Sequence, residues 1–263
     1  MTKLHERFWL WGHPENCYFN CWGNYNHSRM TPLEGALYVG ARNVFMVPVG
    51  NHVNPRQYNK SFFPLSHVGW SIDNAVGNHH VVDQLIEYAR EFPNVTCGVF
   101  DDFVGQNKLN LPVSAFQAVH DRLHNNGVRP LDMWMVLYTH EFGVDPAFDS
   151  KFQPYIAPFD GIIMWTWEEK NIVLFEEKFK RFMKMTEGKR HMLGLYLYNF
   201  GEHKQATGKA VLWQLNRYRE LLYSGDVEGV VLHSNTMADL DYEAYDVCRA
   251  WMAEHGDEEI ADL

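Results

Sequence analysis

The sequence predicts an α/β fold, a single (β/α)8 barrel of the TIM-barrel type, and three observations predict it. The chain has 263 residues, close to the roughly 250 residues of this architecture. Short apolar runs alternate with segments of helical periodicity along the whole chain. Parallel strands joined by helical crossovers account for this alternation, and eight such units in a chain of this length favour a closed barrel.

The alternative architecture is an open, doubly wound sheet, which would bind its ligand where the strand order reverses. No glycine-rich phosphate-binding loop follows any apolar run, and this disfavours the open sheet. The sequence contains no internal repeat, low-complexity tract or linker. We therefore expect residues 1–263 to form one domain, with a frayed acidic tail over residues 254–263.

The expected strands are apolar runs over residues 8–12, 44–49, 68–73, 95–103, 133–139, 161–167, 192–199 and 229–233. Thr31 is the expected N-cap of the first helix, which runs to Ala41. Pro112 opens another helix, and Gly127 follows its end. The helices carry apolar stripes with steps of three and four residues: Val82, Leu85, Ala89 and Phe92; Phe116, Val119 and Leu123; Phe148, Phe152, Tyr155 and Phe159; Ile172, Phe175, Phe179 and Phe182; Val211, Leu215, Tyr218 and Leu222; Tyr245, Cys248 and Met252.

Charge and composition exclude several classes of partner. Aspartate and glutamate total 33 against 23 lysines and arginines, a net charge of −10, so the basic face that nucleic acids require is not expected. No apolar stretch of 18 residues occurs, so we expect no membrane contact. The first residues show no signal-peptide pattern, and a cytoplasmic location is expected. Aromatic residues make up 15% of the chain, and such side chains both fill cores and line sugar sites.

The four cysteines are too few for a disulfide scaffold. His13, Cys17 and Cys21 are spaced four apart, as metal ligands on one helix face would be, but no second cluster of matching spacing completes the set. We therefore expect buried structural thiols, no bound metal and no cofactor.

In a barrel of this type the active site lies where the strands end and the following loops begin. Polar and aromatic side chains gather at these expected strand ends. The candidates, in chain order, are His13, Asp73, Asp101, Asp102, His140, Glu141, Trp165, Trp167, Glu168, Asn199, His233 and Asn235.

Alternation along each strand sorts these candidates by direction. If the more apolar face of each strand meets the helices, Asp73, Asp102, Glu168, His233 and Asn235 point into the barrel mouth. The fifth strand is ambiguous, because Tyr138 and His140 oppose Thr139 and Glu141.

A ring of carboxylates at the mouth is the minimal apparatus for glycoside hydrolysis, which uses one neutral and one charged carboxyl group. We assign Asp102 as base or nucleophile and Glu168 as general acid, with Glu141 as a further catalytic candidate. The substrate, a carbohydrate or other small molecule, would be bound by the remaining candidates: His13, Asp73, Asp101, His140, Trp165, Trp167, Asn199, His233 and Asn235. Asp101 and Asp102 also fit a turn cap, and Glu168 also fits the solvated first turn of a helix.

The run Gly98-Val-Phe-Asp-Asp-Phe103 resembles the fourth-strand end of bacterial TIM-barrel proteins of the glycoside-hydrolase type. The resemblance implies an active-site mouth at this run. Many retaining barrels carry an Asn-Glu pair after the fourth strand, where this chain has Asp101 and Asp102, and a glutamate at the seventh. Other barrel glycosidases use carboxylates after the fourth and sixth strands, which correspond here to Asp102 and Glu168.

Two other functions fit the same residues. The first is a metal-dependent barrel isomerase, lyase or hydrolase, because histidines lie near many strand ends: His13, His52, His79, His80, His140, His203 and His233. The second is a barrel that binds carbohydrate without catalysis, which needs the aromatic side chains but no paired carboxylates.

Overall fold

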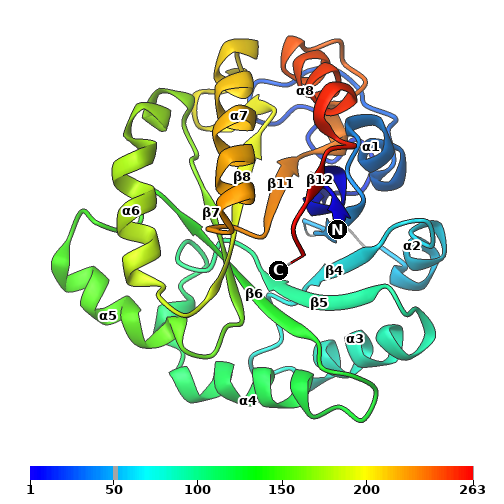
Figure 1. The fold of residues 1–263 in the computed structure, drawn as a ribbon. Coiled ribbons are helices and arrows are strands. Elements are labelled where there is room, and N and C mark those ends of the chain that lie inside the picture. Colours follow the sequence, from blue (N-terminus) through cyan, green and yellow to red (C-terminus); the bar gives the residue numbers. More distant parts are fainter. Residues whose placement is uncertain (50–52, 263) are drawn as a thin grey trace.

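The computed structural model, which describes residues 1–49 and 53–262, is a closed barrel of eight parallel strands (Figure 1). The predicted fold class is thereby confirmed. Around the barrel the strand order is β11-β2-β3-β4-β5-β6-β7-β8. The strands are β2 (Phe8–Gly12), β3 (Asn43–Met46), β4 (His67–Ser71), β5 (Val95–Phe100), β6 (Asp132–Tyr138), β7 (Gly161–Trp165), β8 (Arg190–Tyr196) and β11 (Gly229–His233).

A ring of helices surrounds the barrel (Figure 1). They are α1 (Pro32–Val39), α2 (Pro55–Ser61), α3 (His79–Glu91), α4 (Val113–His124), α5 (Pro146–Ile156), α6 (Phe175–Met185), α7 (Gly208–Ser224) and α8 (Glu243–His255). Helix α2 was not predicted, because its short polar sequence has no apolar stripe; Asn54 caps it by accepting a hydrogen bond from the N–H of Gln57. At α1 the predicted cap is confirmed: Thr31 and Glu34 each accept the other's backbone N–H.

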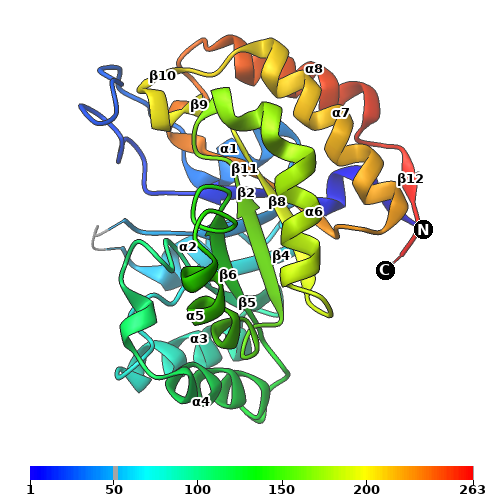
Figure 2. The same ribbon diagram turned by 90° about the vertical axis from the view of Figure 1, so that its left-hand side faces the viewer.

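Two short ribbons mark the opposite ends of the barrel. Strands β1 (Thr2–Lys3) and β12 (Glu259–Ile260) pair near the termini, and β9 (Tyr198–Asn199) pairs with β10 (Lys204–Gln205) at the other end (Figure 2). A frayed tail was expected over residues 254–263, and this expectation is wrong for the part of the tail up to Ile260. Helix α8 continues to His255, and the carbonyl of Glu258 accepts the N–H of Leu4.

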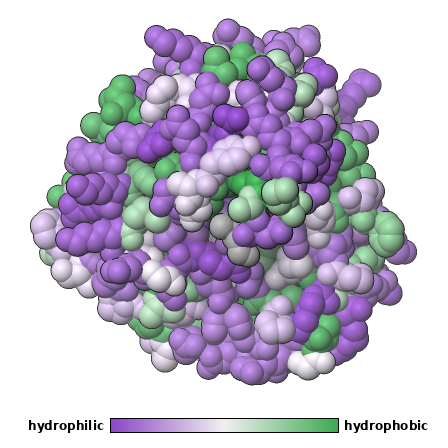
Figure 3. All heavy atoms as spheres, in the orientation of Figure 1, coloured by the Kyte–Doolittle hydropathy of each residue, from purple (hydrophilic) through white to green (hydrophobic). Residues whose placement is uncertain are grey.

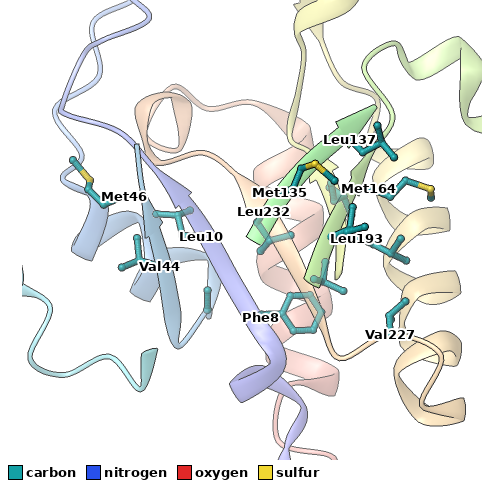
Figure 4. Close-up of a cluster of buried hydrophobic side chains, with 14 of the residues drawn as sticks. Phe8, Leu10, Val44, Met46, Met135, Leu137, Met164, Leu193, Val227 and Leu232 are labelled. Carbon is teal, nitrogen blue, oxygen red and sulfur yellow. The ribbon is translucent and has the colours of Figure 1, made fainter. Parts of the chain in front are cut away.

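The outward-facing side chains of the strands pack against the helices in the larger apolar core. Phe8, Leu10, Val44, Met135 and Leu193 belong to this layer, which Figure 4 shows from several strands at once. These side chains are fully buried, and each contributes about 1.5–3 kcal/mol by leaving water.

A second apolar cluster fills the barrel interior and contains Trp9, Trp11, Phe45, Trp134 and Trp165. Rings of this size fit because glycines on the adjacent strands leave room for them. Phe45 lies across from Gly69, and Trp134 across from Gly161, in the strand register.

Each ring occupies space that a side chain on the facing glycine would otherwise fill. A Cβ on Gly69, Gly161 or Gly194 would lie 2.5, 2.2 or 1.9 Å from the ring of Phe45, Trp134 or Trp165, respectively. Each of these glycines is therefore required by packing rather than by backbone conformation.

The face of the molecule in Figure 3 is mainly hydrophilic, with apolar side chains scattered between polar ones. Among the described residues, no helix combines the length and the apolar character needed to cross a membrane.

Replacing Gly194 by alanine is expected to destabilise the barrel by about 2–3 kcal/mol, because the new methyl group overlaps the Trp165 ring. A loss of stability would be the opposite of the usual effect, since alanine in a strand interior is otherwise about 0.5–1 kcal/mol more stabilising than glycine. Urea unfolding of both proteins measures the difference. Gly105→Ala is the control, because its Cβ would meet its nearest atom at an ordinary 3.7 Å, and equal stability of the two variants would contradict the packing argument.

Candidate active site

A cavity of about 160 Å³ lies at the carboxyl ends of the barrel strands. Two carboxylates, Asp101 and Asp102, line it together with His233. Its other walls are mainly aromatic: Trp11, Tyr18, Trp22, Tyr138, Trp165, Trp167, Tyr196 and Phe200. The cavity occupies the position where the barrel architecture predicts an active site.

Three aspartates are linked through backbone N–H groups beside this cavity. Asp73 accepts the hydroxyl of Ser71 at 2.6 Å and the N–H of Asp101 at 2.7 Å. Asp101 in turn accepts the N–H of Asp102 at 2.9 Å. The ammonium group of Lys108 donates to the backbone carbonyl of Asp73. The chain of bonds fixes the turn that follows β5.

Burial raises the pKa of Asp101 well above its usual range, and the neighbouring charges of Asp102 and Asp73 raise it further. Burial also raises the pKa of Asp73, although the Ser71 hydroxyl and the Asp101 N–H oppose this effect. Asp101 therefore keeps its proton to a higher pH than a free aspartic acid does.

Asp102 enters the cavity through an unusual backbone conformation, with φ at 44°. Its Oδ1 atom accepts a hydrogen bond from the Tyr138 hydroxyl at 2.7 Å. Burial raises the pKa of Tyr138 well above its usual range, so this tyrosine remains a hydrogen-bond donor. Tyr138 thus holds the Asp102 carboxylate in one orientation.

Glu141 lies one turn beyond β6, and its Oε2 atom accepts the backbone N–H of Tyr138 at 2.9 Å. Burial raises its pKa to about 7, and the charge of Asp102 adds to the effect. Its carboxyl group is near the cavity but does not line it.

His13 and His233 meet at the base of the mouth, with their Nε2 atoms 3.2 Å apart. The Nδ1 atom of His13 lies 2.7 Å from the carbonyl of Val47, which requires an Nδ1–H donor. Burial lowers the pKa of His13 to about 4, so its Nε2 carries a lone pair, which can accept from His233 or from the Tyr18 hydroxyl at 3.0 Å.

Two buried polar atoms of the cavity wall have no hydrogen-bond partner among the described residues: Nδ1 of His233 and Nε1 of Trp165. When His233 donates from Nε2 to His13, its Nδ1 is an acceptor. The indole Nε1–H of Trp165 is a donor. Both atoms are inaccessible to water, so these unpaired groups lie within the packed wall rather than on its surface.

The other sequence candidates lie around the cavity without lining it. Asn235 accepts the N–H of His13 and donates to the carbonyls of His13 and Met30, so it positions the loop after β2. Asn199 bonds to Glu202, and its Oδ1 also accepts the N–H of Glu169. The ring of His140 stacks on that of Tyr138, with centroids 5.4 Å apart.

Glu168 follows the end of β7 at the rim. Its carboxylate pairs with Lys170 at 3.0 Å and accepts from the Asn171 amide at 2.9 Å. It does not line the cavity.

The directions predicted from alternation are wrong for β7 and for the strand residues of β5, although Asp102, which follows β5, does line the cavity. On β5 the side chains of Cys97 and Val99 fill the interior, and Asp101 continues this inward face. On β7 the inward set is Ile163 and Trp165, not the set that contains Glu168. Polarity could not distinguish the two faces, because this barrel interior is as apolar as the layer that meets the helices.

Sequence reasoning missed the tyrosines of the site, Tyr18, Tyr138 and Tyr196. A signal for Tyr196 exists in the sequence, because it lies two residues after Gly194 on the inward face of β8. No comparable signal identifies Tyr18, which reaches the cavity from the long loop after β2.

The metal-dependent alternative relied on histidines at strand ends, and one of these, His52, lies outside the described residues. Among the histidines that the structure does describe, those at the mouth form no group of three possible ligands within 4.8 Å. The expectation of buried thiols holds for Cys97 and Cys248, whereas Cys17 is partly exposed and Cys21 is exposed.

Glu141→Gln is expected to change how stability depends on pH. The pKa of Glu141 is about 7 in the native chain against an ordinary value of 4.5. Between pH 4.5 and 7 the native chain therefore binds a proton at Glu141 that the unfolded chain does not. The stabilisation is complete below about pH 4.5 and is lost as the pH rises through 7, about 3 kcal/mol in total.

Urea unfolding of the wild type and Glu141→Gln at pH 4.5, 6 and 8 measures this difference. Glu177→Gln, on an exposed part of α6, controls for the loss of one negative charge. Parallel pH profiles for the wild type and Glu141→Gln would contradict the assignment.

Comparison with known proteins places the fold but no family. No protein-family model and no curated protein sequence matches this chain. Among solved structures, the chain is similar to the catalytic domain of a hyperthermophilic chitinase from Pyrococcus furiosus, with a TM-score of 0.61, 11% identity and coverage of 97% of each chain. It is also similar to a chitinase from Chromobacterium violaceum (TM-score 0.56, 10% identity, 93% of this chain and 98% of that one). A tryptophan synthase from M. tuberculosis is similar as well (TM-score 0.51, 10% identity, 96% and 92%). At these identities the likeness establishes a TIM-barrel fold.

Proposed function

We propose that this chain is a carbohydrate-active hydrolase that cleaves a glycosidic bond with carboxyl groups at the mouth of its barrel. One observation carries the proposal: Asp101 and Asp102 line the same aromatic-walled cavity, and burial keeps the pKa of Asp101 high. Glycoside hydrolysis needs two carboxyl groups, one of which keeps its proton to act as the acid. The similarity to two chitinases agrees with the proposal, although the tryptophan synthase likeness fits other barrel enzymes.

Asp101 acts as the general acid and Asp102 as the base or nucleophile. The proton of Asp101 passes to the glycosidic oxygen as the bond between this oxygen and the anomeric carbon breaks. Asp102, oriented by the Tyr138 hydroxyl, then attacks the anomeric carbon or takes a proton from the attacking water. Glu168 was expected to be the acid, but its pairing with Lys170 and Asn171 favours Asp101 for this role.

The cavity wall suits a sugar in shape and in polarity. Trp167 is partly exposed in the cavity wall and can stack against a sugar ring, whereas Trp11 and Trp165 are almost fully buried and form the floor. The carboxyl groups of Asp101 and Asp102 line the same cavity and can bond sugar hydroxyls. The volume of about 160 Å³ is below the roughly 300–1,000 Å³ of drug-sized sites, which favours a single sugar unit. A cytoplasmic location stays a prediction.

Asp101→Asn and Asp102→Asn are each expected to lower kcat/KM by at least 100-fold, the usual contribution of a positioned acid or base. A panel of 4-nitrophenyl glycosides identifies the sugar, and the natural-type glycosides of that sugar measure the loss in Asp101→Asn, because 4-nitrophenolate leaves without help from a general acid. Glu168→Gln is the matched control, and it is expected to change kcat/KM less than about threefold because its carboxylate is held at the rim.

If Glu168→Gln abolishes turnover while Asp101→Asn retains it, the acid is Glu168 and the assignment of Asp101 to that role is wrong. Full turnover in both Asp101→Asn and Asp102→Asn would overturn the carboxylate mechanism altogether.

The pH profile should reflect the raised pKa of Asp101. A general acid works only while protonated, so kcat/KM should decline on the alkaline side at a pH well above that of an ordinary aspartic acid. In Asp101→Asn this alkaline limb should disappear from the residual activity, whereas Glu168→Gln should keep it. An unchanged alkaline limb in Asp101→Asn would assign the limb to another group.

A further inference from the structure

A separate cluster of two histidines and one aspartate lies at the end of the barrel opposite the cavity. His120 and His124 occupy successive turns at the end of α4, and Asp160 immediately precedes β7. Nε2 of His120 lies 3.3 Å from Oδ1 of Asp160, and Nε2 of His124 lies 3.0 Å from Oδ2. One possible ligand atom from each residue lies within 4.8 Å of the other two, and no other group of described residues meets this condition.

Asp160 is held in place by its own backbone and by its neighbours. Its N–H donates to the carbonyl of Met133, and its carbonyl accepts the N–H of Arg190, both at 3.0 Å. Its Oδ2 atom also accepts the N–H of Met133 at 2.7 Å. The carboxylate therefore stands at a fixed point where β6, β7 and β8 begin.

The two histidines are placed by helix geometry. Residues four apart lie on one helix face, and here the two imidazole rings stack with centroids 4.0 Å apart. All three side chains are partly exposed, by 22% for His120, 29% for His124 and 18% for Asp160, so solvent can reach them.

We propose that His120, His124 and Asp160 bind a zinc ion, with water as the fourth ligand. Imidazole nitrogen and carboxylate oxygen are ligands that zinc prefers. At metal–ligand distances of about 2.0–2.1 Å, the ligands of a tetrahedral site are roughly 3.3 Å apart. The observed 3.3 and 3.0 Å join the two Nε2 atoms to different oxygens of Asp160, so the carboxylate faces both imidazoles and either oxygen can bind an ion held between them.

A neighbouring carboxylate supports His120 in this role. To bind zinc through Nε2, the imidazole must carry its proton on Nδ1. Nδ1 of His120 lies 3.5 Å from Oδ1 of Asp121, which favours a proton on Nδ1 by charge although the distance is long for a hydrogen bond, and equally far from the Gln117 amide nitrogen. The ion would join the end of α4 to the start of β7, so its role is structural and independent of the proposed hydrolase activity.

The test uses the full chain after removal of metal with EDTA and dialysis. Isothermal titration with Zn²⁺ should give one site per chain, and Co²⁺ should give the visible absorption of a tetrahedral complex. Zinc at about 100 times its Kd should raise the Tm by roughly 5 °C. His120→Gln and His124→Gln should each weaken zinc binding at least tenfold, because each removes one ligand.

His255→Gln is the matched control. His255 also pairs with a carboxylate, Glu258 at 2.8 Å, but has no second histidine beside it. Its replacement should leave zinc affinity unchanged. Circular dichroism establishes that each variant is folded.

The proposal is overturned if the wild type binds no stoichiometric zinc, which would make the cluster a hydrogen-bonded ion pair only. It is also overturned if folded His124→Gln keeps wild-type affinity, because the ion would then bind elsewhere. Glycosidase assays on the same variants are a separate measurement, and loss of the hydrolase proposal would leave the zinc titration unaffected.

Discussion

The packing of large aromatic rings inside the barrel is the constraint on which the rest of the structure depends. Trp134 and Trp165 each fill the space left by a glycine on the next strand, and Phe45 does the same at Gly69. Trp165 also meets Trp11 in an edge-to-face contact at 5.6 Å, and both rings line the cavity above them. The same side chains thus fill the interior and form the floor of the candidate site.

This aromatic floor also explains the electrostatics of the mouth. Three partly buried aspartates come together here, and burial is the largest cause of the raised pKa of Asp101. Backbone N–H groups compensate Asp73 and Asp101, while a tyrosine hydroxyl compensates Asp102. Burial raises the pKa of both Asp101 and Asp73, and a carboxyl group that keeps its proton is what general-acid chemistry requires.

The fold was predictable because chain length and periodicity are properties of whole segments. The first and last barrel strands, Phe8–Gly12 and Gly229–His233, have the predicted bounds. Helix α2 could not be predicted because it has no apolar stripe. The site was only partly predictable: Asp101, Asp102, Trp165 and His233 line the cavity, but Glu168 lies at the rim. The direction of the Glu168 side chain depends on which face of β7 points into the barrel. Because the two faces of the strands are equally apolar, only the glycines of neighbouring strands indicate which face is interior.

The pairing of each interior ring with a glycine on the next strand has an evolutionary consequence. Neither partner can change alone: a larger residue at Gly161 requires a smaller one at Trp134, and a smaller residue at Trp134 leaves a void beside Gly161. Sequences that descend from a common ancestor with this chain should therefore vary at these two positions together. The partners lie 27 positions apart for Trp134 and Gly161 and 29 positions apart for Trp165 and Gly194, and these spacings identify such descendants after overall similarity has faded.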